Sequence, residues 1–334
     1  MAKSMAVVAG QLLTDPVAIA KSPAEITNWG HWVVLANFEG EFRAINFANS
    51  NSLTELPVEK FQPVTNWSSS LSQAQYLDLV LFVQEQIQAG EVYQVNLCRI
   101  LTADLNYRPN AFALWQRIDA RHKTKFSGFL NLEPGVLDEV GYWLVSASPE
   151  LFLEVTGEKI VSAPIKGTAV TAAQMLEKDK AENVMITDMV RNDLGQIAKT
   201  GSVKVEQLLH LEQIPGMVQL VSTVSAQLKP GTTWSQIFDA TFPPASVTGA
   251  PKLAAQRLIK KLEPVARLGY CGAFGLIQGD TAQLAVGIRS FEYKANQLRF
   301  GTGAGITVGS DPAGEWQETE LKAKRLIQLA SEDD

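Results

Sequence analysis

With 334 residues, of which 46% are hydrophobic and 19% charged, the chain has an ordinary globular composition and can bury a substantial core. A net charge of -6 argues against a nucleic-acid partner, because phosphate binding depends on concentrated Lys and Arg. Two cysteines and three histidines are too few for a disulfide framework or a four-cysteine zinc site, so metal ligands are expected to be oxygen atoms.

The first residues of the chain do not read as a signal peptide, because Gln11, Thr14 and Asp15 interrupt the apolar run. No stretch of the sequence is apolar for long enough to span a membrane. We therefore expect a cytoplasmic protein with no membrane partner.

The N-terminal part of the chain predicts a short β-rich segment, residues 1–70, packed on the rest of the protein. Residues 31–47 contain two β-prone runs joined near Glu39 and Gly40, which predicts a hairpin. A polar stretch follows from Asn49 to Ser70. Because no repeat or Pro/Gly/Ser-rich linker divides the chain, we expect one large catalytic domain over residues 71–334.

Beyond residue 70, predicted helices alternate with blocks of consecutive strands. Helical patterns cover residues 71–90, 172–198, 251–263 and 314–330. Strand patterns cover residues 91–105, 126–132, 141–148, 150–157, 158–164, 217–228, 269–278 and 283–293. Blocks of strands favour an α+β fold with an antiparallel sheet over a doubly wound fold.

Two acidic pairs have the same one-turn spacing on predicted helices: Asp179 with Glu182, and Glu315 with Glu318. Residues three apart share a helix face, and magnesium takes oxygen ligands while keeping waters and a substrate oxygen. The alternative is that both pairs are solvated helix faces, the usual fate of Asp and Glu. Lys322, four residues after Glu318, would hold a substrate carboxylate or form an ordinary Glu-Lys helix pair.

The stretch "FGTGAGI", residues 300–306, predicts a glycine-rich loop directly after a strand. Such a loop lets backbone N–H groups approach an anion, and a plain turn is the alternative. It lacks the Lys-Ser/Thr of a phosphate loop and the spacing of a dinucleotide fingerprint, so a nucleotide cofactor is not expected.

Lys166 stands in the apolar stretch "SAPIKGTAV", although an unpaired ammonium is costly to bury. A lysine in such a setting can act as a nucleophile, whereas a structural lysine would extend its stem so that the ammonium reaches water. Tight loops at "SASPELF" and "FPPASVTGAPK" present Glu150, Thr248 and Lys252, which are functional or merely exposed.

Several motifs occur together in one order along the chain: "EVYQVNLCR", "SPELF", "PIKGT", "AENVMITDMVRNDLG", "SVTGAPK", "GYCGAFG", "FGTGAGI" and "GEWQET". In this order the sequence resembles the chorismate-utilising enzymes, and within them the aminodeoxychorismate (para-aminobenzoate) branch. The resemblance covers roughly residues 72 to 331. It implies a large α/β sandwich of two packed β-sheets with outer helices, and a site between the sheets.

The resemblance also implies roles for particular residues. Glu182 and Glu318 would bind magnesium, which holds the ring carboxylate of chorismate, while Asp179 and Glu315 would support it through water. Glu150 would act as general acid for the departing C4 hydroxyl. The candidate substrate-binding residues are Thr168, Gln219, Thr248, Lys252, Tyr270, Arg289, Gly303, Gly305 and Lys322.

Two positions, Gln94 and Lys166, separate the branches of the family by reaction, and Gln219 is a departure from anthranilate synthases and some close relatives. Isochorismate and salicylate synthases carry a lysine as general base for water where this chain has Gln94. Anthranilate synthases carry alanine where it has Lys166, so the resemblance implies attack of this amine on C2 and then addition of ammonia at C4. Gln219 replaces a histidine linked to pyruvate loss in anthranilate synthases, which fits a product that keeps its enolpyruvyl group.

The implied reaction is magnesium-dependent amination of chorismate to 4-amino-4-deoxychorismate, a step toward folate, by an amino-group transferase. Cys98 and Cys271 lie in apolar, strand-like settings, where a thiol is usually inert. A separate glutamine amidotransferase subunit is therefore expected to supply the ammonia. Two alternatives stay open, namely component I of anthranilate synthase and a catalytically silent chorismate-binding relative.

Overall fold

The computed structural model describes residues 4–333 except residues 54–55, 137–140, 170 and 215–216. Its strands are β1 (Met5–Val8), β2 (Gln11–Ala20), β3 (His31–Ala36), β4 (Phe42–Ser52), β5 (Ser68–Ser69), β6 (Gln94–Asp104), β7 (Phe126–Leu132), β8 (Tyr142–Ser148), β9 (Leu151–Thr156), β10 (Lys159–Ala163), β11 (Ile165–Ala169), β12 (Lys204–Ile214), β13 (Met217–Gln227), β14 (Gly249–Ala250), β15 (Ala273–Gln278), β16 (Thr281–Val286), β17 (Ser290–Lys294) and β18 (Gln297–Ile306). Its α-helices are α1 (Gln73–Gln88), α2 (Ala111–Arg121), α3 (Glu177–Ile197), α4 (Trp234–Thr241), α5 (Lys252–Leu262) and α6 (Pro312–Ser331).

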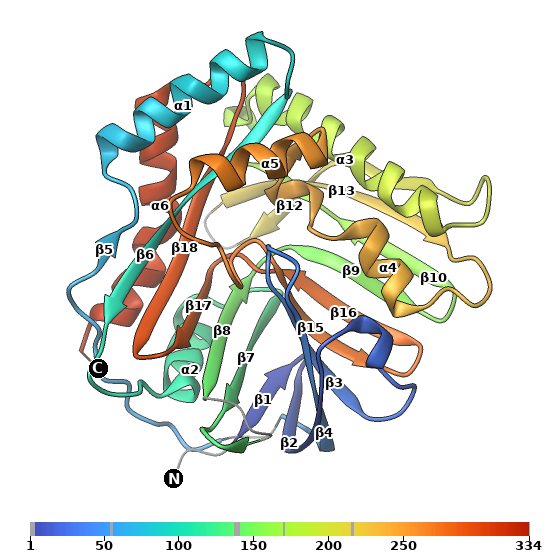
Figure 1. Ribbon diagram of the computed structural model, residues 1–334, viewed down its shortest axis with the longest axis vertical. Helices are drawn as coiled ribbons and strands as arrows, with labels where there is room; N and C mark the ends of the chain where they lie inside the picture. The colour runs from blue at the N-terminus through green and yellow to red at the C-terminus, as the bar shows by residue number, and fades with distance from the viewer. Residues whose placement is uncertain (1–3, 54–55, 137–140, 170, 215–216, 334) are drawn as a thin grey trace.

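The strands form one continuous strip in which the pairings are antiparallel. Along its hydrogen bonds the strip runs β6-β18-β17-β8-β7-β1-β2-β4-β3-β15-β16-β9-β10-β13-β12, with β5 and β14 beside β6 and β11 beside β13. The strip folds back on itself, and the helices lie on its outside (Figure 1). The predicted α+β fold with a large sheet and outer helices is confirmed.

An apolar cluster fills the space where the strip folds back. Leu130 of β7 and Leu144 of β8 contribute from one half, and Val33 of β3 and Leu276 of β15 contribute from the other. All four side chains are buried. The two expected layers are therefore the two halves of one strip, held together by apolar burial.

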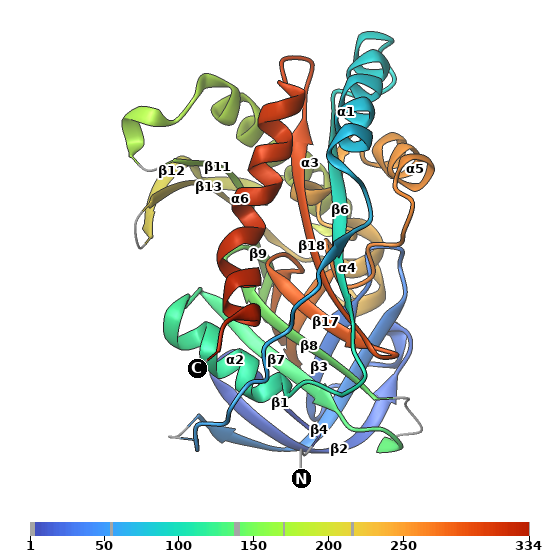
Figure 2. The ribbon, with the colours of Figure 1, turned by 90° about the vertical axis from the view of Figure 1, so that its left-hand side faces the viewer.

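The outer helices begin at local signals in the sequence. At α1, Ser72 accepts a hydrogen bond from the backbone N–H of Gln75, whose side chain accepts one from the backbone N–H of Ser72. At α6, Asp311 accepts from the backbone N–H of Gly314 and Pro312 occupies the first turn. Figure 2 shows α6 in front of β18, with which it is in contact.

The N-terminal segment joins the sheet directly. The predicted hairpin is confirmed as β3 and β4, and β3 also pairs with β15, while β1 pairs with β7. Strands from either side of residue 70 are thus hydrogen-bonded neighbours, and the division into two domains at that residue stays a prediction.

Three features differ from the sequence-based expectation. The single strand expected at residues 283–293 is two strands, β16 and β17, because the chain turns at Arg289, which has a φ of 53°. The long helix begins at Glu177, after a 3-10 turn at Ala172–Gln174. The patterns of β12, α2 and α4 were not recognised in the sequence.

The glycine-rich segment at residues 300–306 is not a loop. It forms the end of β18, paired with β6 from Gln297 opposite Asp104 to Ile306 opposite Val95. Its glycines therefore serve close packing inside a sheet, and the expected anion loop is wrong.

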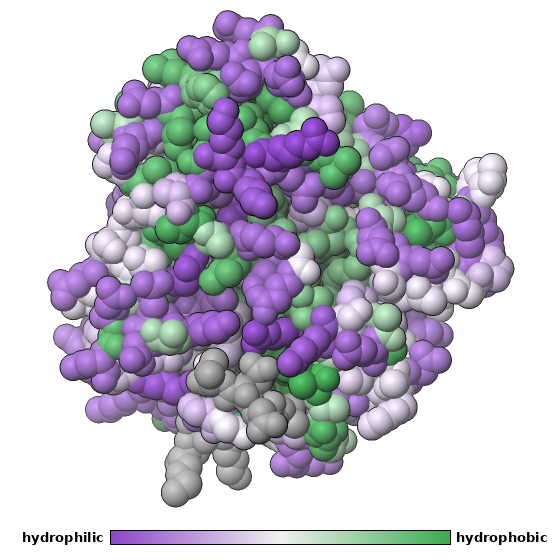
Figure 3. All heavy atoms as spheres, viewed as in Figure 1, coloured by the Kyte–Doolittle hydropathy of each residue, from purple (hydrophilic) through white to green (hydrophobic). Residues whose placement is uncertain are grey.

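None of the helices in the described ranges is long and apolar enough to cross a membrane. Polar side chains cover most of the face seen in Figure 3.

Candidate active site

The two ends of the strip meet where β6 and β18 approach β11 and α3. The side-chain Nε2 of Gln94 on β6 donates to Oε2 of Glu182 on α3 at 2.9 Å. A Cβ at Gly305 on β18 would lie 3.3 Å from Oε2 of Glu182 and 3.4 Å from Nζ of Lys166 on β11. Residues far apart in the sequence thus share one small region, and a side chain at residue 305 would intrude into it.

The alternate glycines of β18 leave room for groups packed against this strand. A Cβ at Gly301 would lie 2.0 Å from the Tyr270 ring, and one at Gly303 would lie 2.6 Å from Sγ of Cys98. Because such distances are far below van der Waals contact, Tyr270 keeps its place only while residue 301 is glycine. The glycines therefore position Tyr270 next to β18.

The acidic pair on α3 faces the site. Burial raises the pKa of Glu182, and the charges of Asp179 and Glu318 add to the rise, while Lys166 opposes it. Asp179 accepts a hydrogen bond from the backbone N–H of Leu176 at 3.0 Å, at the start of α3. The two carboxylates on α3 are half-buried.

The acidic pair on α6 lies opposite. Burial raises the pKa of Glu318, but the Lys322 ammonium at 2.6 Å outweighs it, so the pKa lies below its usual value. Lys322 also donates to the backbone carbonyl of Gly303 at 3.0 Å. Glu315 is 4% exposed, and it accepts a hydrogen bond from the Ser310 hydroxyl at 2.6 Å. Glu315 is buried, and Asp179, Glu182 and Glu318 are half-buried, which favours a shared site over solvated helix faces.

These carboxylates have the character of a magnesium site completed by substrate. Among the described residues, no three His, Cys, Asp or Glu side chains form a cluster that would hold a metal ion by themselves. Magnesium usually needs only one or two protein carboxylates beside water and substrate oxygens, and Glu318 lies close enough to Glu182 to raise its pKa. Oε2 of Glu315 is buried without a hydrogen-bond partner, which leaves an acceptor for a metal-bound water. The residues present fit this ion.

Glu150 lies in the turn between β8 and β9 and is 3% exposed. Burial raises its pKa to about 7, against the opposing effects of a hydrogen bond with Ser246 and the charge of Lys166. Its Oε1 has no hydrogen-bond partner. A carboxyl with this pKa is present in both protonation states near neutral pH, as a general acid requires.

Two cations, Lys166 and Arg289, lie near Glu150. Burial lowers the pKa of Arg289, and the charge of Glu150 counteracts this effect. Lys166 is half-buried and interacts electrostatically with Glu150, Glu182 and Glu318. Within the described ranges, neither side chain forms a hydrogen bond or an ion pair of its own. Both are therefore available to an anionic ligand.

The other candidate residues lie in different settings. Gln219 on β13 is 2% exposed and pairs with Thr168 of β11, which is exposed. Thr248 is buried and donates to the carbonyl of Pro244 at 2.8 Å, so the alternative that it is merely exposed is wrong, as it is for Glu150. Lys252 is half-buried and already ion-paired, and its assignment to substrate binding stays a prediction.

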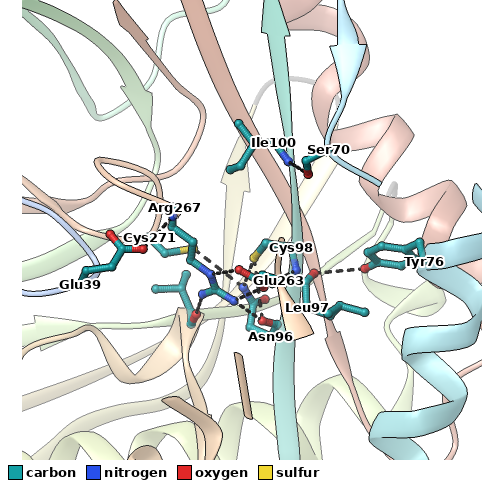
Figure 4. A network of polar contacts seen from close by, with 11 residues as sticks. Glu39, Ser70, Tyr76, Asn96, Leu97, Cys98, Ile100, Glu263, Arg267 and Cys271 are labelled. Atoms are coloured by element: carbon teal, nitrogen blue, oxygen red, sulfur yellow. Dashed lines mark hydrogen bonds and ion pairs between the residues drawn. The ribbon is translucent and has the colours of Figure 1, made fainter. Parts of the chain in front are cut away.

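Behind β6 lies a buried polar network that the sequence did not reveal (Figure 4). Arg267 donates to both carboxylate oxygens of Glu263, at 2.8 and 2.6 Å, and to the carbonyls of Asn96 and Val247. Its guanidinium carbon also lies 4.3 Å from the centre of the Phe38 ring. The network fixes the loop before Thr248 against β6, so it acts on the site through position.

Ser246 and Asp193 are further residues near the site that the sequence analysis did not single out. Both stand inside quoted motifs, "SVTGAPK" and "VRNDLG". Nothing in their spacing distinguishes them from neighbouring loop or helix residues. Only the fold brings Ser246 to Glu150 and buries Asp193.

The family model for chorismate binding enzymes matches residues 31–328. The chain belongs to this family. Aminodeoxychorismate synthase component 1 of Escherichia coli is 35% identical over 285 residues, which cover 81% of this chain and 61% of that protein. Anthranilate synthase component 1 of Thermus thermophilus is 34% identical over 288 residues, which cover 82% and 60%. The chain thus spans about three fifths of the length of these curated relatives.

Solved structures of the family have the same fold. Anthranilate synthase component I of Streptococcus pneumoniae superposes with a TM-score of 0.81 at 20% identity and covers 97% of this chain and 92% of that chain. MenF, the menaquinone-specific isochorismate synthase of Escherichia coli, gives 0.81 at 18% identity and covers 98% and 88%. Because related folds carry different chorismate reactions, the reaction must be argued from the site.

Proposed function

We propose that the chain is component I of aminodeoxychorismate synthase, which aminates chorismate at C4 to give 4-amino-4-deoxychorismate. The observation that carries this proposal is Lys166, which forms no hydrogen bond or ion pair with the residues that the structure describes and lies beside the protonatable Glu150 and the carboxylates Glu182 and Glu318. The relatives named aminodeoxychorismate synthase component 1 support it.

Glu182 and Glu318 would hold Mg²⁺, with Asp179 and Glu315 behind them. When bound, the ion would supply positive charge for the ring carboxylate of chorismate. Arg289 offers a guanidinium to a substrate carboxylate, and Lys322, Tyr270, Thr168 and the backbone at Gly303 and Gly305 orient the two carboxylates. A dianionic substrate needs such cations and backbone donors.

In the first step, Lys166 gives its ammonium proton to solvent, and the resulting neutral amine attacks C2 and forms a C–N bond. The ring electrons shift, the C4–O bond breaks, and Glu150 gives its proton to the oxygen, which leaves as water. In the second step, ammonia adds to C4, the electrons shift back, and the bond between C2 and Lys166 breaks. The product leaves with its new amino group protonated, and Glu150 is left ionised.

Gln94 supports amination over hydration. Its amide cannot act as a base for water, and its Nε2 is engaged with Glu182. Anthranilate synthase is the second candidate, because the Thermus thermophilus relative is nearly as similar as the Escherichia coli one. Lys166 opposes it, since the amine would occupy the carbon that ammonia attacks in that reaction.

The test is to incubate the purified chain with chorismate, magnesium and ammonium and to identify the product by mass. We expect 4-amino-4-deoxychorismate, with magnesium dependence shown by a chelator. Anthranilate as product would favour the second candidate. Chorismate that binds but remains unchanged would indicate a catalytically silent relative.

The ammonia source gives a separate prediction. Cys98 and Cys271 are buried, and burial raises the pKa of Cys98 well above its usual value, so neither suits a glutaminase nucleophile. We expect glutamine to be used only after a glutamine amidotransferase subunit is added, whereas free ammonium suffices without it. Robust glutamine-dependent turnover by the isolated chain would contradict this.

A further inference from the structure

A cavity of about 20 Å³ lies between Glu150 and α3. Its walls come from β9, β10, α3, the end of α4 and the turn at residues 244–246. Glu150 and Asp193 both line it, and among the described residues Lys166, Glu182 and Arg289 do not. The volume is enough for one water molecule, provided that polar groups hold it.

Such polar groups are present. The lining includes the buried hydroxyl residues Ser162, Thr241 and Ser246. Ser246 lies close enough to the Glu150 carboxyl to lower its pKa, and Oε1 of Glu150 is buried and has no partner in the described part of the chain. A water with at least two polar neighbours is therefore favoured over an empty void.

Asp193 connects this cavity to the outside of the protein. Its Oδ2 accepts from Nζ of Lys252 at 2.6 Å, and the same ammonium donates to the carbonyl of Thr241 at 3.0 Å. The Lys252 side chain is 16% exposed, so its end of the pair reaches solvent. Burial raises the pKa of Asp193 to about 6, against the charge of Lys252, while that of Glu150 is about 7. The two acids are thus matched for proton exchange.

We propose that Asp193, paired with Lys252, returns a proton to Glu150 after each turnover through a water molecule in this cavity. The inference rests on the proposed function, in which Glu150 gives its proton to the departing hydroxyl. The cavity water gives a proton to the Glu150 carboxylate and takes one from the Asp193 carboxyl. Asp193 then takes a proton from bulk water at the Lys252 end, so no further reactant is needed.

Other charges also act on Glu150, and they must be separated from this route. Lys166 from β11, Arg289 from the turn before β17 and Lys322 from α6 interact with its carboxylate. These cations influence its pKa from outside the cavity, whereas Asp193 lines the cavity itself. A change at Asp193 therefore tests the route while these three cations stay in place.

The test compares the first turnover with steady-state turnover in Asp193→Asn. The resting enzyme already carries a proton on Glu150 in part of its population, so we expect a near-normal first turnover. Later turnovers should slow about ten-fold or more above neutral pH, at the lower end of the scale for a lost proton transfer, with a larger solvent deuterium isotope effect on kcat. The KM for chorismate should not change.

The matched control is Asp188→Asn on the same helix, because Asp188 forms an exposed ion pair with Arg191. We expect it to behave as wild type. If Asp193 only holds α3 against α5, Asp193→Asn would slow the first turnover and later turnovers equally at every pH. That result would overturn the proposal.

An infrared measurement tests the cavity water without any turnover. The carbonyl stretch of protonated Glu150, identified by its loss in Glu150→Gln, should be lowered by a hydrogen bond from the water. Ser162→Val, which fills the cavity, should raise that frequency. If Ser162→Val does not fold, Asp193→Asn is measured in its place and should also shift the band. An unshifted band in a folded variant would overturn the cavity water, whereas failure to aminate chorismate would overturn only the proposed function.

Discussion

Two regions of this protein contain buried or half-buried cations but differ in how those cations are partnered. In the network behind β6, the buried Arg267 is satisfied by Glu263 and two backbone carbonyls. In the site, Lys166 and Arg289 have no hydrogen-bonded partner among the described residues. In the first region the charged groups stabilise the fold, whereas in the second the cations are available to bind an anionic ligand. Substitutions should therefore damage stability in one region and activity in the other.

The largest effect is expected from Lys166→Ala. Removing the proposed nucleophile should lower C4 amination on the order of 10⁴-fold, the scale seen when a reacting group is removed. Remaining turnover with ammonium should shift toward a C2-aminated product, because the space of the amine is vacated. Product identity by chromatography and mass, with a search for a chorismate adduct on the peptide that contains Lys166, measures this.

If the site cations do not hold the fold together, Lys166→Ala should leave the stability of the protein nearly unchanged. Since Lys166 has no hydrogen bond or ion pair in the described part of the chain and only electrostatic interactions with nearby carboxylates, the free energy of unfolding should stay within about 1 kcal/mol of wild type. An unchanged C4 product at an unchanged rate would show that Lys166 is structural. A large loss of stability would show that the two regions do not differ in the way argued.

The complementary change is Glu263→Gln. Arg267 would keep its buried position but lose the full charge of its partner, and breaking a buried pair typically costs about 3–5 kcal/mol. Denaturant unfolding should show this loss, while chorismate turnover per folded molecule should fall much less. The exposed pair on α3 provides the control, since Arg191→Gln should change stability by less than about 1 kcal/mol. Equal losses in both variants would contradict a special role for burial.

The sequence predicts features that depend on residues close together in the chain better than features that depend on distant residues. Helical periodicity and the Ser72 cap act over a few residues, so α1 and α6 were predicted close to their observed ends. The one-turn spacing of the acidic pairs is equally local. Such signals need no knowledge of the fold, and the helices that they predicted are present in the structure.

Long-range packing was not visible. The glycines of β18 read as a loop because their reason lies in Tyr270, Cys98 and Lys166, which approach from elsewhere in the chain. Arg267 and Glu263, four residues apart, look like an ordinary helix-surface pair until burial is known. The resemblance to a family supplied roles for the site residues, whereas local patterns alone left each one ambiguous.

The carboxylates Glu182 and Glu318 give a third test of whether charges in the site serve activity more than stability. Glu182→Gln and Glu318→Gln should each lower turnover by about 10²-fold, or roughly 3 kcal/mol of transition-state stabilisation, because each removes a negative charge from the proposed metal site. Part of the loss in Glu182→Gln should be recovered at high magnesium. Magnesium titrations of the rate measure both effects. Near-normal turnover in both variants, or insensitivity to a chelator, would contradict the assignment.

The smallest effect is expected on the free energy of unfolding, which is lowered by burial of Glu150. The pKa of Glu150 rises from 4.5 to about 7 on folding, so the folded state binds this proton more tightly than the unfolded state. The associated stability is fully present below the unfolded pKa and is lost as pH rises through the folded pKa. Glu150→Gln stays neutral throughout, so its unfolding free energy should exceed that of wild type by up to about 3 kcal/mol near pH 8.

The gain from Glu150→Gln should disappear below about pH 4, where wild-type Glu150 is protonated in both states. Amination should be lost at every pH, because an amide cannot donate the proton that the departing hydroxyl needs. Glu177→Gln, on the exposed start of α3, should show no pH-dependent gain. Denaturant unfolding across the pH range, beside the rate of amination, compares the variants. A variant less stable than wild type at high pH would mean that the ionised Glu150 is stabilised by its cations, so that Lys166 and Arg289 are partners of Glu150 and are not held free for substrate.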